Sequence, residues 1–244
     1  MMLAEGAIQV VMIVVFGIIA VVGIYFGNKA AKQRRLDLLA LSGRLGLSFS
    51  EGHDSFHDEE FGHFELFSRG FGRSAYNTLS GGVVIGGVGG HPMRVKMGDY
   101  KYKTREGSGK NRRTVTHRFS YCLVMLPWEG MPDVLIRKEG FFDKVSSAFG
   151  FDDIDFESNE FSKKYFVKSP NKKLAYDICH PRMIEWLLET EPSVVDMERG
   201  RVCMTDGSRV WKVDRFEYTL GWVDRFIEQW PDFLVKDLEE GNIV

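Results

Sequence analysis

One uncharged run near the N-terminus, Ile8–Phe26, constrains this chain more than any other feature of its sequence. It holds 19 residues, and its one polar side chain is that of Gln9. An α-helix of this length spans about 28 Å, close to the hydrocarbon thickness of a bilayer. A signal peptide is disfavoured because no Lys or Arg precedes the run and because Tyr25 and Phe26 close it. A soluble core helix would carry polar residues along one face. The run therefore predicts a transmembrane helix.

Basic residues flank this run on one side only. Lys29, Lys32, Arg34 and Arg35 follow it within nine residues, and no Lys or Arg precedes it. Positively charged flanks of a membrane span stay on the cytoplasmic side. We therefore expect a single-pass protein of the inner (cytoplasmic) membrane, with its N-terminus outside and its C-terminal domain in the cytoplasm.

The rest of the chain has the composition of a folded protein. Hydrophobic residues make up 44% of the sequence and charged residues 27%, which is typical of globular domains and excludes wholesale disorder. The three cysteines form no C-x-x-C pair, so neither a disulfide framework nor a four-cysteine zinc site is expected. We divide the chain into a transmembrane anchor (1–28), a juxtamembrane helix or linker (29–50) and a soluble domain (51–244).

Alternating apolar residues predict strands in the first half of that domain. Met93, Val95 and Met97 alternate with basic residues, and a slip of the pattern at Gly98–Asp99 suggests a bulge. A second alternating run, 119–125, predicts a hairpin whose tip is the basic stretch Thr104–Thr114. An acidic loop over Glu51–Glu65 is expected to lead into a strand at Phe64–Phe67. Two further short strands are expected at Val134–Ile136 and Tyr165–Val167. A second hairpin is expected from Val194–Met197 and Arg201–Met204, with its turn at Arg199–Gly200.

Helical patterns dominate the second half. The clearest is an amphipathic stripe from Phe216 to Ile227, which Pro231 breaks or restarts. Strands followed by helices indicate an α+β domain of antiparallel strands with helices in its C-terminal half. The other expected helices are the continuation of the N-terminal helix to about Leu45, Phe141–Phe149, Leu174–Ile178 and a helix opened by Pro181 that runs through Leu188.

Two histidines, His53 and His57, have the i, i+4 spacing of a zincin helix, with Asp54 where that motif has Glu. The surrounding residues are acidic rather than apolar, so the sequence favours a solvated loop. Whether this loop binds a divalent metal stays open. No metal site and no cofactor are predicted.

Two other motifs invite a catalytic interpretation. Cys179 and His180 are adjacent, but neighbours on one element generally point apart, so we expect Cys179 in the core and His180 near a helix cap. The stretch 81–90 contains six glycines but matches neither a P-loop nor a dinucleotide fingerprint, so it predicts a glycine-rich strand or turn. No catalytic residue is assigned.

Positive charge gathers at the predicted hairpin. Residues 101–118 hold seven Lys and Arg against a single Glu, in a chain whose net charge is -2. Nucleic acid is disfavoured as a partner because the tip lacks aromatic residues for stacking on bases. We expect contact with anionic lipid headgroups or a protein partner; the alternative is a solvated loop that aids solubility. The candidate contact residues are Lys101, Lys103, Arg105, Lys110, Arg112, Arg113 and Arg118.

Several strings of this sequence resemble a group of uncharacterised bacterial proteins that join one N-terminal transmembrane helix to a soluble domain of unknown function. The resemblance spans about residues 29–205 and implies that architecture, but no activity and no site residue. The matching residues are 64–73, Asn77, Leu79, Gly81, Gly90, Pro92, Asp99, Tyr100, Tyr102, Glu160-Phe161, Tyr165-Phe166-Val167 and 180–188.

These features favour a membrane-tethered cytosolic binding module without catalysis. The alternative is a membrane-anchored enzyme whose pocket is assembled from residues far apart in the sequence. A cluster of titratable groups lining a deep pocket would favour the enzyme, whereas an exposed basic or apolar patch would favour the binding module.

Overall fold

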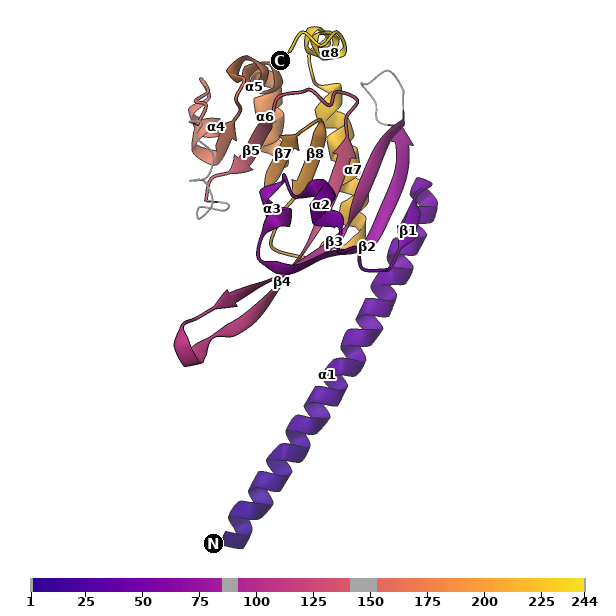
Figure 1. Ribbon diagram of the computed structural model, residues 1–244, viewed down its shortest axis with the longest axis vertical. Helices are drawn as coiled ribbons and strands as arrows, with labels where there is room; N and C mark the ends of the chain where they lie inside the picture. Colours follow the sequence, from indigo (N-terminus) through magenta and orange to yellow (C-terminus); the bar gives the residue numbers. More distant parts are fainter. Residues whose placement is uncertain (1, 85–91, 141–152, 244) are drawn as a thin grey trace.

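The computed structural model describes residues 2–84, 92–140 and 153–243, and it has the α+β architecture that the sequence predicts (Figure 1). A long N-terminal helix joins an antiparallel sheet of strand order β1-β2-β3-β4-β8-β7-β5-β6. The helices are α1 Met2–Leu45, α2 His57–Phe61, α3 Glu65–Ser68, η1 Gly109–Asn111, α4 Asn159–Lys164, α5 Lys172–Ile178, α6 Pro181–Thr190, α7 Val213–Glu228 and α8 Asp232–Glu239. The strands are β1 Ser48–Ser50, β2 Phe71–Val84, β3 Pro92–Glu106, β4 Arg113–Met125, β5 Val134–Lys138, β6 Tyr165–Lys168, β7 Val194–Glu198 and β8 Arg201–Thr205.

The N-terminal half of α1 extends away from the sheet, and it is long and apolar enough to cross a membrane (Figure 1). Its apolar side chains from Met12 onward are exposed, unlike those of a buried core helix. The helix ends at Leu45, as predicted. Gly46 takes a φ of +67°, and the Leu47 amide donates to the Ser42 carbonyl at 2.8 Å, which closes the helix in a Schellman motif.

The C-terminal end of α1 belongs to the domain core. Leu38 and Leu41 are fully buried there, in the same cluster as Met97 of β3 and Phe216 of α7. The expected division into a linker (29–50) and a separate domain (51–244) stays a prediction. These contacts show that the C-terminal end of α1, which continues from the apolar segment, is packed onto the sheet.

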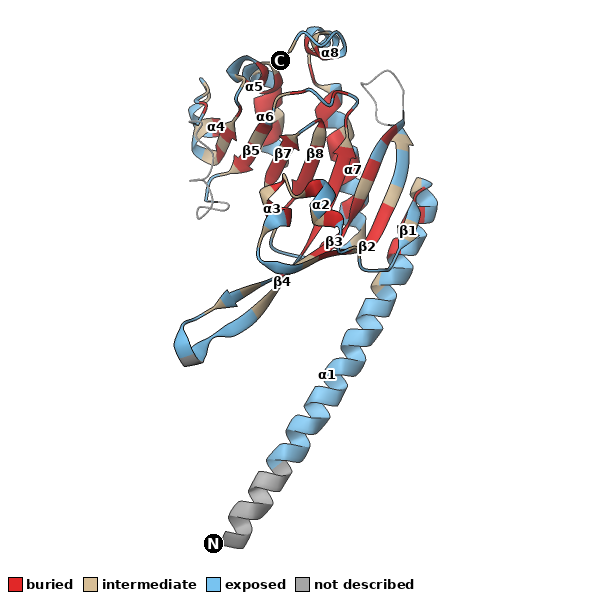
Figure 2. Cartoon of the chain, viewed as in Figure 1, coloured by how far each residue is buried: buried red, intermediate tan, exposed pale blue. Residues whose placement is uncertain are grey.

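The sheet is covered on both faces, with α7 and the end of α1 on one side and α2 and α3 on the other (Figures 1 and 2). The α7 side holds the larger core. The α2–α3 side holds a smaller, aromatic core that includes Phe61, Phe67, Tyr100 and Tyr121.

The strand expected at Phe64–Phe67 is wrong, and the loop expected over Glu51–Glu65 is confirmed only up to Phe56. Residues 57–61 form α2, and α3 begins at Glu65. Phe61, Phe64 and Phe67 recur every three residues, and all three are buried against the sheet. This helical spacing lies within an acidic sequence, where the charge pattern suggested a solvated loop.

The sheet does have an irregularity at the Gly98–Asp99 bulge that the sequence predicts, because the β2–β3 register shifts opposite Gly98. The prediction put it in the wrong strand, since β3 pairs with β4 without interruption from Arg94 to Glu106. The apolar pattern slips because the covered face changes along the strand. Met97 faces the α7 core, whereas Tyr100 faces the aromatic core. The irregularity lies in the neighbouring strand β2, between Tyr76 and Leu79.

The remaining predicted elements that fall on described residues are confirmed. Strands β7 and β8 form a hairpin that turns at Arg199 and Gly200, both with positive φ. Pro231 separates α7 from α8. Within the glycine-rich stretch, Gly81 and Gly82 belong to β2, while residues 85–90 lie outside the described residues. The helix predicted at Phe141–Phe149 also lies outside them.

Candidate functional site

A buried ion pair fixes α1 to the sheet. Arg34 donates from Nε and Nη2 to the two carboxylate oxygens of Asp99, at 2.8 and 2.6 Å, and from Nη1 to the Trp211 carbonyl at 2.7 Å. Asp99 is fully buried, and it also accepts hydrogen bonds from Asn77 (3.0 Å) and Ser120 (2.6 Å). A two-pronged guanidinium–carboxylate contact defines orientation as well as distance. The direction in which α1 leaves the domain is therefore set by this network.

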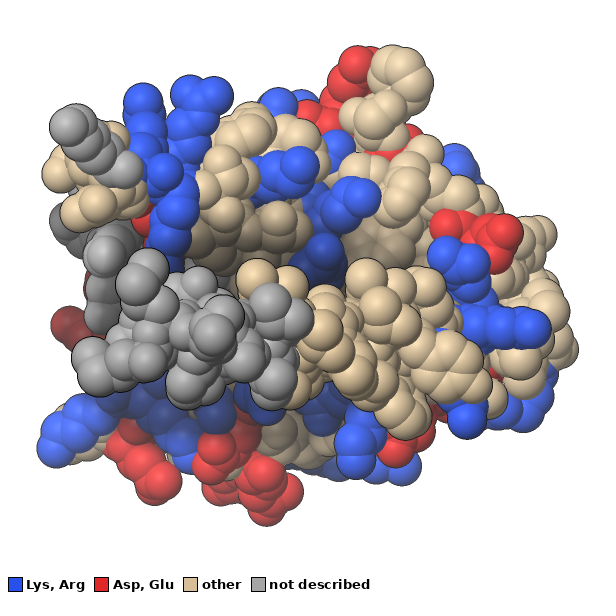
Figure 3. All heavy atoms as spheres, turned by 90° about the horizontal axis from the view of Figure 1, so that it is seen from below, with Lys and Arg blue, Asp and Glu red and all other residues tan. Residues whose placement is uncertain are grey.

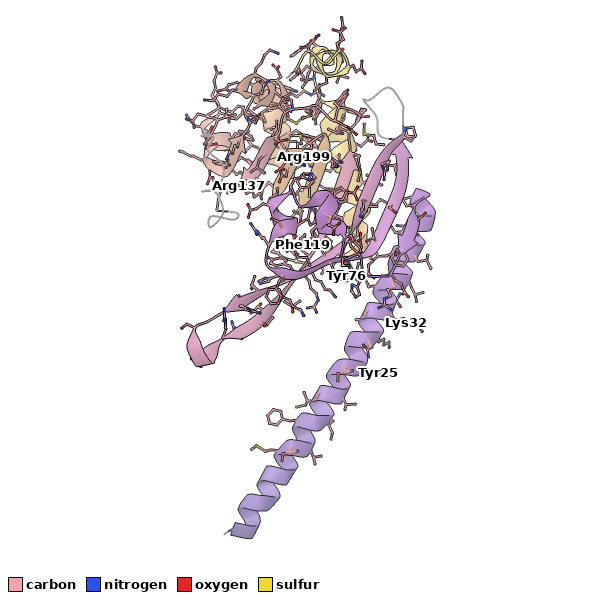
Figure 4. All side chains as sticks on the ribbon, in the orientation of Figure 1. Tyr25, Lys32, Tyr76, Phe119, Arg137 and Arg199 are labelled. Carbon is pink, nitrogen blue, oxygen red and sulfur yellow. The ribbon has the colours of Figure 1, made fainter. Side chains whose placement is uncertain are left out.

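The β3–β4 hairpin, confirmed by the structure, extends beyond the rest of the sheet. Pairing of β3 with β2 ends at Lys103, and pairing of β4 with β8 begins at Tyr121. Among the residues that the structure describes, the hairpin tip, residues 104–116, is therefore paired only with itself. It projects toward the same end of the molecule as the apolar part of α1, and it reaches about the level of Tyr25 (Figures 1 and 4).

The seven candidate basic residues do not share one face of this hairpin. Lys101, Lys103 and Arg105 alternate along β3, and Arg118 lies directly opposite Lys101, so these four side chains share a face. Arg113 lies opposite Glu106 on the other face and pairs with it at 3.1 Å. Arg112 is exposed at the end of η1, and the side chain of Lys110 lies outside the described part of the chain.

The surface from which α1 projects is rich in cations. Viewed along that end, Figure 3 shows Lys and Arg side chains over much of the face, with fewer acidic side chains, most of them near its edges. At the root of the hairpin, burial and the charges of Arg118 and Lys103 lower the pKa of Lys101. Like charges held this close repel one another, so the arrangement favours an anionic partner.

The two histidines of the candidate metal motif are not brought together on one helix, since α2 begins only at His57. His57 is buried among Phe61, Phe67, Tyr100 and Tyr121, and burial lowers its pKa to about 3. His53 instead lies 3.5 Å from both Ser74 Oγ and Lys101 Nζ. The solvated-loop interpretation is thus wrong for His57. Among the described residues, no group of three His, Cys, Asp or Glu could hold a metal ion.

Cys179 and His180 are arranged as expected for structural residues. Cys179 is buried at the end of α5, and burial raises the pKa of its thiol to about 12. His180 is the N-cap of α6: its Nδ1 accepts from the Met183 amide at 3.3 Å. Its Nε2 lies 3.0 Å from the Gln229 carbonyl. A protonated thiol beside a hydrogen-bonded imidazole lacks the geometry of a nucleophile and its base.

The structure also contains a pocket that the sequence did not indicate. Its volume is about 160 Å³, and it lies between α3 and the face of β5, β6, β7 and β8 that α2 leaves uncovered. Arg137, labelled in Figure 4, marks its position on β5. The walls are mainly apolar, with charged groups among them; the lining includes Phe64, Leu66, Leu135, Phe166, Val194, Glu65, Arg69, Asp133, Lys168, Asp196 and Glu198.

Two carboxyl groups in this pocket, Asp196 and Glu198, have strongly perturbed pKa values. They alternate on β7 and hydrogen-bond to each other. Burial, reinforced by the charge of Asp133, raises the pKa of Glu198 to about 7. Burial and the charges of Glu198, Asp133 and Glu65 raise the pKa of Asp196 well above its usual range. Such a pair can hold a proton near neutral pH and exchange it with a ligand.

The described residues thus define an α+β domain carried on a long N-terminal apolar helix. No protein-family model matches the sequence, and no curated protein matches it. Among solved structures, the chain is similar to the crystal structure of the mycobacterial trehalose monomycolate transport factor A, TtfA. The TM-score is 0.48 and the sequence identity 11%, over 82% of this chain and 96% of that chain. At this identity and score the likeness assigns no activity, ligand or site to this chain.

Proposed function

We propose that this chain is a single-pass membrane protein whose cytoplasmic domain binds an anionic surface through its basic hairpin. The observation that carries the proposal is the common direction of α1 and the hairpin, whose tip reaches the level of Tyr25 (Figure 4). Tyr25 and Phe26 close the apolar run, and aromatic residues are typical of the membrane interface. The tip would therefore lie at the height of the lipid headgroups.

The rigid junction between α1 and the sheet supports this geometry. A flexible tether would let the domain turn any face toward the membrane, but the buried Arg34–Asp99 pair fixes one. Anionic lipid attracts each basic residue near the surface by about 1 kcal/mol, an effect that decays within a Debye length. Several cations on a projecting hairpin are therefore enough to hold the domain against an anionic leaflet.

The orientation of the chain is tested by a phosphatase reporter fused after Val244, which is active only outside the cytoplasm. We expect the fusion to be silent, because all basic flanking residues follow the apolar run. An active fusion would reverse the proposed orientation. Replacing Lys29 and Lys32 with Ser should raise the reporter signal, since fewer positive charges then hold the C-terminal side in the cytoplasm.

The membrane contact is tested with the full chain in nanodiscs, by labelling a cysteine introduced at the exposed tip position Ser108. The native Cys122, Cys179 and Cys203 are buried, so labelling is selective. We expect a headgroup-attached quencher to reduce the emission of a Ser108→Cys label in anionic discs. The effect should weaken in neutral discs, at high salt, and when Lys110, Arg112 and Arg113 become Ser. A label at Glu239→Cys on α8, at the opposite end of the molecule (Figure 1), serves as the control.

Equal quenching of the tip label in anionic and neutral discs, or none in either, would contradict the proposal. The first result would mean that proximity arises from the anchor alone. The second would mean that the hairpin stays in solvent.

A second candidate function, ligand binding or catalysis in the pocket, is favoured by the hydrogen-bonded Asp196 and Glu198. The test is native mass spectrometry of the full chain in detergent, comparing the wild type with a Val194→Phe variant that fills the pocket. A small molecule retained by the wild type and lost from the variant supports this function. The absence of bound mass from both argues against it.

A further inference from the structure

We propose that the root of the hairpin contains a discrete site for one phosphate group. This inference rests on the proposed function and deepens it, because it assigns a chemical ligand to part of the basic surface. This site, the root cluster, consists of Arg35, His53, Tyr76, Lys101 and Arg118.

Its centre is a pair of cations fixed by strand pairing. Lys101 on β3 lies directly opposite Arg118 on β4, and Lys103 follows on the same face. Like charges at directly opposed positions destabilise a sheet. Within the described residues, neither Lys101 nor Arg118 has a carboxylate within ion-pair distance. The repulsion is therefore not relieved by the protein itself, and an anion would relieve it.

Two further nitrogen-bearing side chains approach from outside the hairpin. Nε2 of His53 lies 3.5 Å from Nζ of Lys101. Burial and the nearby charges of Lys101 and Arg35 lower the pKa of His53. Arg35 belongs to α1, and its contact with Glu51 is 3.4 Å between two half-exposed side chains, so it contributes little stability and remains exchangeable.

Tyr76 forms an aromatic wall of the site. Its ring centroid is 5.6 Å from that of His53, and Lys101 Nζ lies 5.8 Å from the Tyr76 centroid. Burial raises the pKa of Tyr76 to about 12, so its hydroxyl stays protonated and can donate a hydrogen bond. The Lys101 ammonium, the His53 imidazole and the Tyr76 ring therefore lie together, with Arg118 directly opposite Lys101 on β4.

This donor set suits a phosphate better than a carboxylate. A phosphate monoester presents three acceptor oxygens and close to two negative charges, so it can engage several donors at once. Bound phosphate would also raise the pKa of His53 and draw a proton onto its ring.

The position of the root cluster limits the source of this phosphate. Tyr76 lies at the lower edge of the sheet, farther from the apolar end of α1 than Lys32, whereas the tip reaches the level of Tyr25 (Figure 4). Seven residues of helix separate Tyr25 from Lys32, which is about 10 Å. The phosphate would come either from a lipid headgroup that projects from the surface or from a soluble phosphate compound.

The experiment is calorimetric titration of the full chain in neutral detergent with inorganic phosphate and with glycerol 3-phosphate. Sodium chloride at equal ionic strength is the reference. We expect saturable binding in the wild type. A Lys101→Met, Arg118→Met variant should bind at least tenfold more weakly. Its fold should be retained, because Met keeps the apolar stem and the repulsion is removed.

A tip variant with Lys110, Arg112 and Arg113 changed to Ser is the matched control, and it should bind phosphate as the wild type does. No saturable binding by the wild type, or equal affinity of the wild type and the Lys101→Met, Arg118→Met variant, would overturn the proposal. The source is then distinguished in nanodiscs by comparing phosphatidic acid, a monoester, with phosphatidylglycerol, a diester. A preference for phosphatidic acid that soluble glycerol 3-phosphate abolishes identifies the lipid; binding of glycerol 3-phosphate without that preference identifies a soluble ligand.

The two proposals fail separately. Loss of tip quenching with intact phosphate binding would contradict the membrane contact but not the site. Intact tip quenching without phosphate binding would leave a diffuse electrostatic contact and remove the site.

Discussion

The hairpin and the pocket hold charge in opposite ways. The hairpin carries cations such as Arg105 and Arg112 on an element surrounded by solvent, where water screens them. The pocket encloses Asp196 and Glu198, and there burial makes their ionised forms costly enough to raise both pKa values. Charge on a projecting element can therefore vary with little effect on folding, whereas charge inside the domain is coupled to stability and to pH.

The Arg34–Asp99 pair is buried, like the carboxyl groups of the pocket, but it sets the direction of α1 relative to the sheet and its hairpin. Breaking this pair should lower the free energy of unfolding more than any other change considered. Asp99→Ala leaves Arg34 without its partner and removes the acceptor of Asn77 and Ser120. Breaking a buried pair from one side costs about 3–5 kcal/mol. We expect a loss of that size in urea unfolding of the full chain in detergent, followed by tryptophan fluorescence.

The control for this measurement is Glu217→Ala, which breaks the exposed pair with Arg44. Exposed pairs contribute about 0–1 kcal/mol. If Asp99→Ala and Glu217→Ala were equally mild, α1 would not be fixed to the sheet by this network. A fragment that begins at Leu36 should behave like Asp99→Ala, because it lacks Arg34, whereas one that begins at Asn28 should keep the wild-type stability.

The next largest loss in the free energy of unfolding is expected at the buried His57, in contrast to the exposed His53. His57 fills a space among aromatic rings, so His57→Ala should cost about 2 kcal/mol or more through the cavity that it leaves. His57→Phe should cost less than His57→Ala, because neither ring nitrogen of His57 has a hydrogen-bond partner to lose within the described part of the chain. The measurement is the same urea titration. His53→Ala is the control and should change the free energy of unfolding by about 0.5 kcal/mol or less; equal losses at His53 and His57 would show that His57 is not a core residue.

The difference between these regions also explains what the sequence could predict. The hairpin was predictable because alternation and charge lie within one contiguous stretch, 93–125. The end of α1 at Leu45, the turn at Arg199–Gly200 and the cap at His180 are likewise local signals. All of them are determined by residues a few positions apart.

The pocket and the Arg34–Asp99 pair were missed because they join residues far apart in the chain. Arg34 and Asp99 are 65 positions apart, and the pocket combines Phe64 with Thr205. The signal for the pocket was weak but present: Asp196 and Glu198 alternate within a predicted strand, on a face that a second layer would bury. Short helices such as α2 carry too few turns for an amphipathic pattern to be recognised.

A smaller, pH-dependent effect is expected in the pocket. The pKa of Glu198 is raised from its usual value near 4.5 to about 7, and that of Asp196 is raised in the same direction. The folded state therefore holds more protons than the unfolded state in this window, so the free energy of unfolding falls as the pH rises from about 4.5 through 7. Unfolding titrations at several pH values should show this fall in the wild type relative to an Asp196→Asn, Glu198→Gln variant.

The lowered pKa of His57 makes the free energy of unfolding rise with pH, which opposes the effect of the carboxyl groups. Subtracting the profile of the variant from that of the wild type removes this contribution, because both proteins contain His57. Glu185→Gln, at an exposed position on α6, is the matched control and should leave the pH profile unchanged. A difference profile that stays flat from pH 4.5 to 8 would mean that both carboxyl groups ionise as they do in the unfolded chain.

The smallest expected effect on folding belongs to the hairpin tip. Changing Lys110, Arg112 and Arg113 together to Ser should shift the free energy of unfolding by about 0.5 kcal/mol or less, because the tip strands pair with each other and with no other described strand. The only ion pair of a described tip side chain that this change removes is the exposed contact between Arg113 and Glu106. The same variant should lose most of the salt-sensitive quenching of the Ser108→Cys label in anionic nanodiscs. A large loss of stability in this variant would show that the tip contributes to folding. Loss of quenching would then be explained by unfolding rather than by the removal of the three cations.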